Sequence, residues 1–105
     1  MRLLHILALL ITGASIASCA AVETLQPTGG SRADGLVKLS YQYGIFEQPQ
    51  VDWAQGLRSA QEVCAGWGYS GARRFAGELS TCDYREAAGD CTQTLVTVTY
   101  QCTGR

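Results

Sequence analysis

Two segments of the chain alternate between apolar and polar residues, which is the pattern of a β-strand with one buried face. In residues 35–44, every second side chain from Val37 to Tyr43 is apolar, and the positions between them are polar. In residues 92–102, the same alternation places Val96, Val98 and Tyr100 on one face. We predict a strand in each segment. The second is the more apolar, so we expect it at the centre of the sheet.

Residues 52–68 change to a helical period. Asp52 is a suitable N-cap, and Gln55 three residues later completes a capping-box pattern. Apolar side chains then recur at intervals of three or four residues, and Gly66 and Gly68 are placed to end the helix. This stripe consists of Trp53, Leu57, Ala60, Cys64 and Trp67. We predict a helix that packs the stripe against the sheet, in preference to one that lines a ligand groove.

The N-terminal residues have the charged, apolar and small-residue order of a secretory signal peptide. Residues 3–11 are apolar except for His5, and this stretch is shorter than the about 20 residues that cross a bilayer. The small residues that follow end in Ile16-Ala17-Ser18-Cys19, which resembles the bacterial lipobox, where the cysteine is acylated. We predict that residues 1–18 are a removed lipoprotein signal peptide and that Cys19 is lipidated. The alternative is conventional cleavage, with Cys19 only a small residue near the cut.

The residues after Cys19 predict the membrane and the domain boundary. In Gram-negative sorting, an aspartate after the lipidated cysteine favours the inner membrane. The residue here is Ala20, which implies anchoring in the outer membrane, facing the periplasm. Residues 19–34 lack periodicity and contain Pro27 and Gly29-Gly30, so we predict a lipidated N-terminus followed by a flexible tether. Residues 35–105 are then the folded domain.

Composition excludes several functions for the mature chain. Removal of 18 of the 105 residues leaves 87, enough for one small domain with a modest core. The loss of Arg2 changes the formal net charge from −1 to −2, and no basic run remains, so we expect no nucleic-acid binding. The single histidine, His5, is also lost, which removes the usual general base and a common metal ligand. We expect no enzyme activity, no catalytic residues, no metal and no cofactor.

Four cysteines remain besides Cys19, and export to an oxidising compartment predicts two disulfides. A zinc site would show paired C-x-x-C motifs, which are absent from the sequence. Cys91 and Cys102 flank one predicted strand and are about 35 Å apart at 3.3 Å per residue, so they cannot pair. In a hairpin that turns near residue 87, Cys82 lies opposite Cys91 and far from Cys102. The predicted pairs are therefore Cys82 with Cys91 and Cys64 with Cys102.

These elements together predict an α+β fold. A third, weakly patterned strand is expected within residues 73–84, and a hairpin loop over residues 84–90. The order strand, helix, strand, strand gives a small β-α-β-β domain with a three-stranded antiparallel sheet, one helix packed on it, and two disulfides.

Four blocks of residues carry a family resemblance. They are Thr28-Gly29-Gly30-Ser31-Arg32-Ala33-Asp34-Gly35, Phe46-Glu47-x-Pro49-x-Val51-Asp52-Trp53, Ala60-x-x-x-Cys64-x-x-Trp67-Gly68-Tyr69 and Tyr100-Gln101-Cys102-Thr103-Gly104. Together they resemble the YecR-like lipoprotein family of small exported bacterial proteins. The resemblance spans nearly all of the mature chain and is weakest over residues 73–90. It implies an envelope lipoprotein, and it transfers no catalytic residue.

Four charged residues are candidates for contacts with a partner. Arg32 and Asp34 lie between glycines, where they either meet a partner or, as we prefer, belong to a turn that starts the first strand. Arg73 and Arg74 either touch anionic lipid or glycan, or are simply solvated. The acidic residues of the hairpin loop lack the EF-hand spacing and do not predict a calcium site.

Three functions remain open at this level. The first is a non-catalytic interaction module that is held on the membrane by its N-terminal lipid and recognises an envelope protein. The second is a purely structural envelope lipoprotein. The third, and least favoured, is a hydrolase of envelope material that uses carboxylates such as Glu78, Asp83 or Glu86, which requires a cleft.

Overall fold

The structure of the chain is a computed structural model that describes residues 20–87 and 89–105. The predicted signal peptide and the predicted lipidation site at Cys19 lie outside the described residues. Within these residues, no helix is both long enough and apolar enough to span a bilayer.

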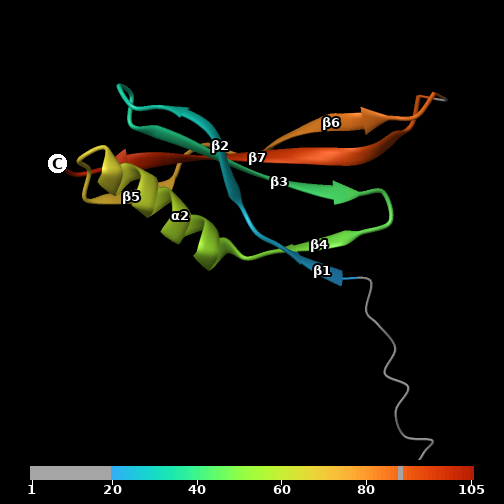
Figure 1. Cartoon of the computed structure of the whole chain (residues 1–105), viewed down its shortest axis with the longest axis horizontal. Coiled ribbons are helices and arrows are strands. Elements are labelled where there is room, and N and C mark those ends of the chain that lie inside the picture. Colours follow the sequence, from blue (N-terminus) through green and yellow to red (C-terminus); the bar gives the residue numbers. More distant parts are fainter. Residues whose placement is uncertain (1–19, 88) are drawn as a thin grey trace, which may run out of the picture.

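The described chain forms a five-stranded antiparallel sheet with one helix on one of its faces (Figure 1). The central strand is β7. One edge of β7 pairs with β3, and the other edge of β3 pairs with β2. The other edge of β7 is shared end to end by β5 and β6. The bounds of the sheet strands are β2 Gln26–Ser31, β3 Leu36–Gly44, β5 Gly71–Arg74, β6 Leu79–Arg85 and β7 Cys91–Thr103. The predictions of the first strand and of a central last strand are confirmed.

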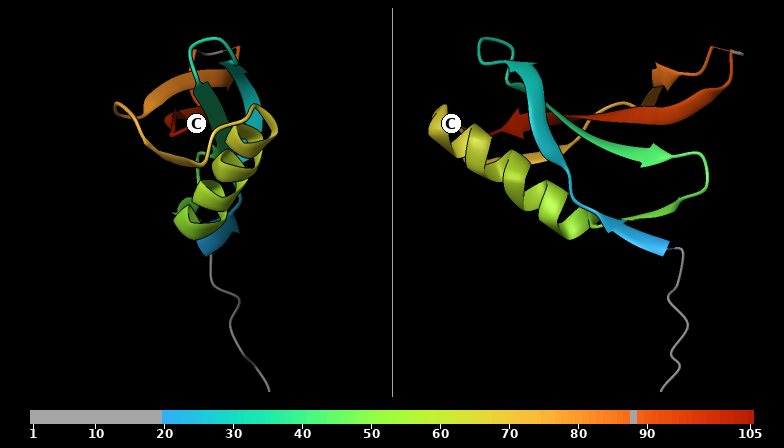
Figure 2. Two further views of the ribbon diagram at one scale, coloured as in Figure 1. Left: turned by 90° about the vertical axis from the view of Figure 1, so that its left-hand side faces the viewer. Right: turned by 45° about the vertical axis from the view of Figure 1, so that its right-hand side comes forward.

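The helix α2 runs from Trp53 to Gly66 and lies across one face of the sheet (Figure 2). Asp52 is its N-cap, as predicted, and accepts a hydrogen bond from the backbone N–H of Gln55. The buried positions are Gly56, Ala60 and Cys64, whereas Trp53 and Leu57 keep 37% and 36% of their surface exposed.

The inner face of α2 is therefore rotated from the predicted stripe, and Gly56 is the reason. A Cβ at this position would collide with Leu25 Cδ1 and would lie 3.2 Å from Tyr100 Oη. The missing side chain lets the helix backbone come close to the sheet along the line of Gly56 and Ala60. The larger Trp53 and Leu57 are left at the margin of the contact.

The sheet has five strands and not three, and the difference begins in the segment expected to be a tether. Residues 26–31 form β2, an edge strand that pairs with β3. A further short strand, β1 (Ala20–Glu23), pairs in parallel with β4 (Gln48–Val51) in a separate two-stranded sheet. Between β1 and β2, Leu25 is completely buried. The tether interpretation therefore does not hold for residues 20–31, because long-range pairing and one core side chain order them.

The third predicted strand is two strands in the structure. β5 ends at Arg74 and β6 begins at Leu79. Between them the backbone turns at Ala76, whose φ of 66° is outside the range of a strand. Both pieces pair antiparallel with β7, as expected for the single predicted strand.

The core lies between α2 and the facing side of the sheet. It consists of Leu25, Val37, Leu39, Tyr41, Ala60, Cys64, Val96, Val98, Tyr100 and Cys102. One disulfide, Cys64–Cys102, lies in this core and joins the end of α2 to the end of β7. The second, Cys82–Cys91, closes the β6–β7 hairpin. These are the two pairs predicted from the sequence.

Candidate functional site

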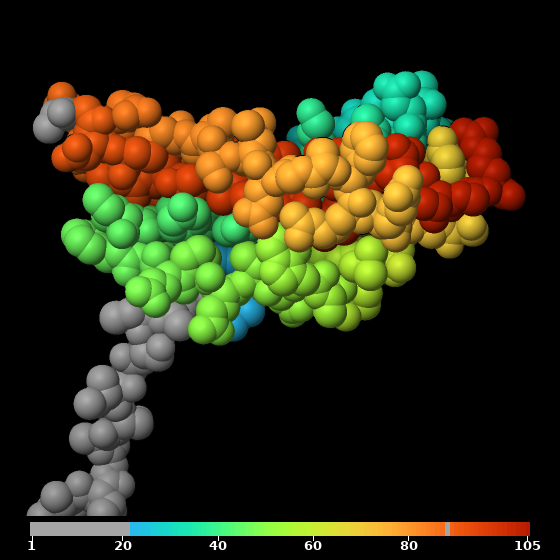
Figure 3. Space-filling model, turned by 180° about the vertical axis from the view of Figure 1, so that it is seen from behind, coloured from blue at the N-terminus to red at the C-terminus, as the bar shows by residue number. Residues whose placement is uncertain are grey.

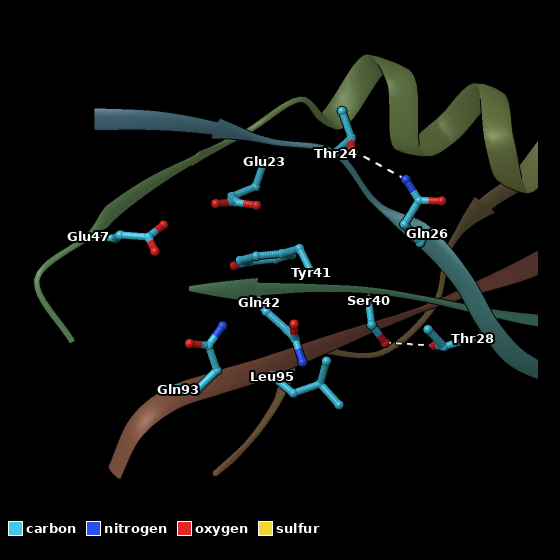
Figure 4. Close-up of a pocket in the computed structure, with 10 residues that line it drawn as sticks. All are labelled: Glu23, Thr24, Gln26, Thr28, Ser40, Tyr41, Gln42, Glu47, Gln93 and Leu95. Atoms are coloured by element: carbon cyan, nitrogen blue, oxygen red, sulfur yellow. Dashed lines mark hydrogen bonds between the residues drawn. The ribbon is translucent and has the colours of Figure 1, made fainter. Parts of the chain in front are cut away.

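A cleft opens where the N-terminal part of the chain leaves the sheet. β2 pairs with β3 only as far as Gln26 and Ser40, and the residues before Gln26 turn away to form β1. β3 continues to Gly44 and still pairs with β7 on one edge. On the other edge, beyond Ser40, no described residue forms a strand beside residues 41–44. The cleft beside this edge has a volume of about 550 Å³ (Figure 4). It is lined by Glu23, Thr24, Gln26, Thr28, Ser40, Tyr41, Gln42, Glu47, Gln93 and Leu95.

Gln55 of the helix fixes the point at which the chain diverges. Its side-chain oxygen accepts from the Leu25 N–H at 2.9 Å, and its side-chain nitrogen donates to the Leu25 carbonyl oxygen at 3.0 Å. The Gln55 side chain thus satisfies the backbone N–H and carbonyl oxygen of Leu25, which would otherwise need a neighbouring strand. The Asp52 N–H, which a complete capping box would have bonded to Gln55, donates to the Glu23 carbonyl oxygen at 3.1 Å. The first turn of α2 therefore holds residues 23–25 away from β3 and keeps the cleft open.

Two carboxyl groups face each other at the mouth of the cleft. Glu23 comes from β1 and Glu47 from the turn between β3 and β4, and both lie near the Tyr41 ring in Figure 4. Glu47 Oε1 accepts a hydrogen bond from the Gly44 N–H at 3.1 Å, which orients this side chain. Burial raises the pKa of Glu23, and a side-chain hydrogen bond and charge repulsion from Glu47 raise it further.

The other wall of the cleft carries uncharged hydrogen-bonding groups. Ser40 Oγ is 2.7 Å from Thr28 Oγ1 and 3.0 Å from Thr97 Oγ1, so three strands are linked by one chain of hydroxyl groups. The Gln42 side chain donates to the Asp83 carboxylate. Burial is also the largest cause of the raised pKa of Tyr41, whose hydroxyl group stays protonated. The lining therefore suits a polar ligand that supplies N–H groups, with a cation favoured near the carboxyl pair.

Comparison with known proteins identifies the family. A model of the YecR-like lipoprotein family matches residues 24–103. The chain belongs to the YecR-like lipoprotein family. The match covers the core, both disulfides and every cleft residue except Glu23. No curated protein matches the chain.

Membership of a lipoprotein family implies membrane anchoring and a place in the cell envelope. The match begins at Thr24, so the part of the chain that matches the YecR-like family includes Leu25 and β2. The resemblance inferred from the four sequence blocks is thus confirmed.

The structure separates the four charged residues that the sequence nominated for partner contacts. Arg32 and Asp34 lie in the exposed turn between β2 and β3, where Gly35 adopts a φ of +65°. The Asp34 carbonyl oxygen accepts from Gln101 Nε2 at 3.3 Å, which attaches the turn to β7. This geometry is that of a turn starting β3. The turn lies at the start of β3, at the opposite end of this strand from the β3–β4 turn that carries Glu47 (Figure 1).

Arg73 and Arg74 do not form one basic patch, because consecutive strand residues point to opposite faces of a sheet. Arg74 lies on the helix side, 4.4 Å from the centre of the Trp53 ring, and its guanidinium is 3.7 Å from Glu78 Oε1. The side chain thus covers the exposed start of α2. Arg73 is exposed on the other face.

The carboxylates named for a hydrolase are dispersed. Glu78 pairs with Arg74, Asp83 accepts from Gln42, and Glu86 lies in the hairpin turn. The pair that does meet in a cleft, Glu23 and Glu47, was not nominated from the sequence. Glu23 was assigned to the tether, and no spacing relates it to Glu47, which comes from a separate segment, the turn between β3 and β4.

Lowering the pH from about 7 to 4.5 should increase the contribution of the Glu23–Glu47 contact to stability. The pKa of Glu23 in the folded protein is above its ordinary value of 4.5, so the folded state binds this proton more tightly than the unfolded chain. The contribution is therefore fully present below pH 4.5 and is lost as the pH rises through the folded-state pKa. Thermal melting of wild type and Glu23→Gln at both pH values measures the effect.

The Glu23→Gln variant should melt with a smaller difference between the two pH values than wild type, because its amide remains neutral throughout. Glu62→Gln is the matched control, since Glu62 is exposed on α2 and its replacement should leave the wild-type pH difference intact. An equal pH difference in wild type and Glu23→Gln would contradict the assignment.

Proposed function

We propose that the protein is anchored in the outer membrane by lipid on Cys19 and faces the periplasm as a non-catalytic interaction module. In this proposal the cleft binds an extended segment of an envelope protein. The family supports a lipid-anchored envelope protein. The interaction role rests on one observation, the strand edge that β3 presents to the cleft.

The hydrogen-bond register of β3 defines what that edge offers. The Cys102 N–H donates to the Gly35 carbonyl oxygen, and the Ile45 N–H donates to that of Thr92. In an antiparallel pair such bonded positions recur at every second residue, so the odd-numbered residues of β3 direct their backbone groups to β7. The even-numbered residues direct theirs to the opposite edge, which for Gln42 is the cleft.

The neighbouring even-numbered positions are occupied. Ser40 pairs with Gln26 of β2. At Gly44, the N–H donates to the Glu47 carboxylate and the carbonyl oxygen accepts from the Glu47 N–H, both at 3.1 Å. Gln42 therefore presents a backbone donor and acceptor in a gap between a paired strand and a closed turn. A short extended peptide in this gap would continue the line of β2 by β-strand addition.

The side chains around the gap favour a basic or neutral peptide. The carboxyl groups of Glu23 and Glu47 lie at one end, where a lysine or arginine of the partner would relieve their mutual repulsion. The threonine, serine and glutamine side chains supply hydrogen bonds without charge.

The contacts of the carboxylates argue for binding over glycoside hydrolysis, which needs two carboxyl groups that act on one sugar. Glu47 accepts a hydrogen bond from the Gly44 N–H, Glu78 lies beside Arg74, and Asp83 accepts from Gln42. His5, the single histidine, precedes Cys19 and is not part of the predicted mature chain.

Site-specific photocrosslinking in intact cells tests the proposal. A photoreactive residue in place of Thr24, an exposed cleft residue, should yield one discrete adduct with an envelope protein. Arg58, exposed on α2 away from the cleft lining, is the control position and should not yield this adduct. Glu47→Lys, combined with the Thr24 probe, should reduce the adduct at least several-fold by repelling a basic segment. The same products from both positions, or none from Thr24, would contradict the interaction role and favour a structural lipoprotein.

A further inference from the structure

An apolar group of residues is exposed at one end of the molecule. Phe46 and Ile45 form the tip of the turn between β3 and β4 and keep 88% and 55% of their surface exposed. Val22 of β1 keeps 71%. Phe46 is the most exposed large apolar side chain of the described residues, and nothing in the fold requires it there. In the space-filling view this turn, drawn in green, lies at one end of the molecule, below the β6–β7 hairpin (Figure 3).

The register of the small parallel sheet places this turn beside the start of the described chain. Ala20 is paired with Gln48, which follows Phe46 by two residues. Figure 1 shows the start of β1 and the β3–β4 turn at the same end of the molecule. Adjacent strands are about 4.8 Å apart, and each residue spans at most about 3.6 Å. Phe46 is therefore within about 12 Å of Ala20.

The residue that precedes Ala20 is Cys19, the proposed lipid attachment site. With β1 beginning at Ala20, no linker separates the anchor from a strand of the folded unit. Acyl chains on Cys19 would then bring the apolar turn close to the membrane surface. A tether of the predicted length would have imposed no such constraint.

We propose that the β3–β4 turn inserts Ile45 and Phe46 into the interfacial region of the bilayer beside the acylated Cys19. This inference rests on the proposed lipid anchor. Apolar side chains at the tip of a surface element bind membranes by burial at the boundary between headgroups and acyl chains. Glu47, the nearest charged side chain in the chain, is turned back onto the Gly44 N–H and away from the tip.

The charged residues at this end do not attract an anionic membrane, so burial of apolar side chains drives the insertion. The β6–β7 hairpin reaches the same end (Figures 1 and 3) and carries Glu86 and Asp90, with Arg85 bonded to the Gly89 carbonyl oxygen. The end therefore has no excess of basic residues to attract anionic headgroups. Docking should occur on a neutral bilayer and should persist at high salt, which screens charge but not apolar burial.

Quenching by brominated lipids tests this arrangement in the full lipidated protein. The protein is reconstituted in neutral phosphatidylcholine vesicles, with an environment-sensitive fluorescent amino acid in place of Phe46. Brominated acyl chains should quench this fluorescence at least several-fold more than the fluorescence of the same probe at Phe75. Phe75 is a matched control because it is also an exposed phenylalanine, but follows β5, far from the turn. The quenching should be the same at low and high salt.

Two further measurements separate the possible failures. The mass of the reconstituted protein reports whether Cys19 carries its acyl groups, and circular dichroism reports whether each labelled protein is folded. Acylated, folded protein without quenching at position 46 would overturn the docking and leave the anchor intact. A protein without acyl groups would overturn the proposed anchor, and with it the docking. Equal quenching at both positions, or self-association that shields position 46 from lipid, would also overturn the proposal.

Discussion

Replacement of Leu25 with alanine should lower the free energy of unfolding by about 3 kcal/mol, within the range of 2–5 kcal/mol for a buried leucine. Leu25 has no exposed surface and lies against Gly56 of α2 in the core. The helix and β2 are both fixed by their own hydrogen bonds, so the space left by the side chain cannot close easily. Urea denaturation of the oxidised protein, followed by circular dichroism, measures the loss.

Val22→Ala, three residues earlier, is the control. Val22 keeps 71% of its surface exposed, so its replacement should change the stability of the protein in solution by no more than about 0.5 kcal/mol. Equal stabilities of the two variants would mean that residues 20–25 are the tether expected from the sequence and not part of the folded unit.

Removal of the disulfide between Cys64 and Cys102 by a double replacement with alanine should cost about 4 kcal/mol. The bond closes a loop with a sequence separation of 38 residues, and the chain-entropy relation gives this value for a loop of that length. A small domain has a total stability of about 5–15 kcal/mol, so the variant should be close to unfolding at body temperature. Thermal and urea melts of the double variant measure the effect.

The double replacement of Cys82 and Cys91 is the comparison. Its loop spans 9 residues, and the same relation gives about 2.6 kcal/mol. The two cysteines are only partly buried at the exposed hairpin, whereas Cys64 and Cys102 lie in the core. Mild reductant should therefore open Cys82–Cys91 first and leave the fold in place. The prediction fails if loss of the hairpin disulfide is the more damaging of the two.

The elements predicted correctly from the sequence are those whose own residues carry a strong period. β3 and β7 alternate because one face of each packs on the helix while the other is polar. The helix start was predicted because Asp52 satisfies a local backbone donor that any helix exposes. The disulfide pairing followed from the separation of Cys91 and Cys102 along one strand and from the predicted hairpin, which placed Cys82 opposite Cys91.

The missed strands lack such local signals. β2 contains Pro27, Gly29 and Gly30, which indicate a turn in isolation but are tolerated in an edge strand that has a neighbour on one side only. β1 and β4 have four residues each and are held by one another across more than twenty residues of sequence. Their pairing is a property of the assembled fold.

The helix face was misplaced for a different reason. Gly56 lies directly against Leu25 and Tyr100, yet a glycine contributes nothing to an apolar stripe read from the sequence. Trp53 and Leu57 are more apolar, and they occupy the margin. Steric fit, not hydrophobicity, determines which side of this helix faces the sheet.

The cleft could not have been predicted, because it exists only where two segments diverge. Glu23 and Glu47 come from two separate segments, and the edge of β3 at Gln42 is open because Gln55 holds Leu25 elsewhere. The sequence did place Gln55 at the third helical position. Its side chain serves a distant backbone segment instead of the local cap.

The central place of β7 in the sheet governs the order in which the molecule can assemble. β3, β5 and β6 all pair with this strand, and it contributes four of the ten core side chains. A polypeptide emerges from the ribosome or a translocation channel with its N-terminus first, so β7 arrives after every element that depends on it. Until then the earlier segments have no sheet to join, and Cys64 has no Cys102 to oxidise with. Formation of the sheet must therefore wait for β7, so the earlier segments cannot complete the fold until residues 91–103 have emerged.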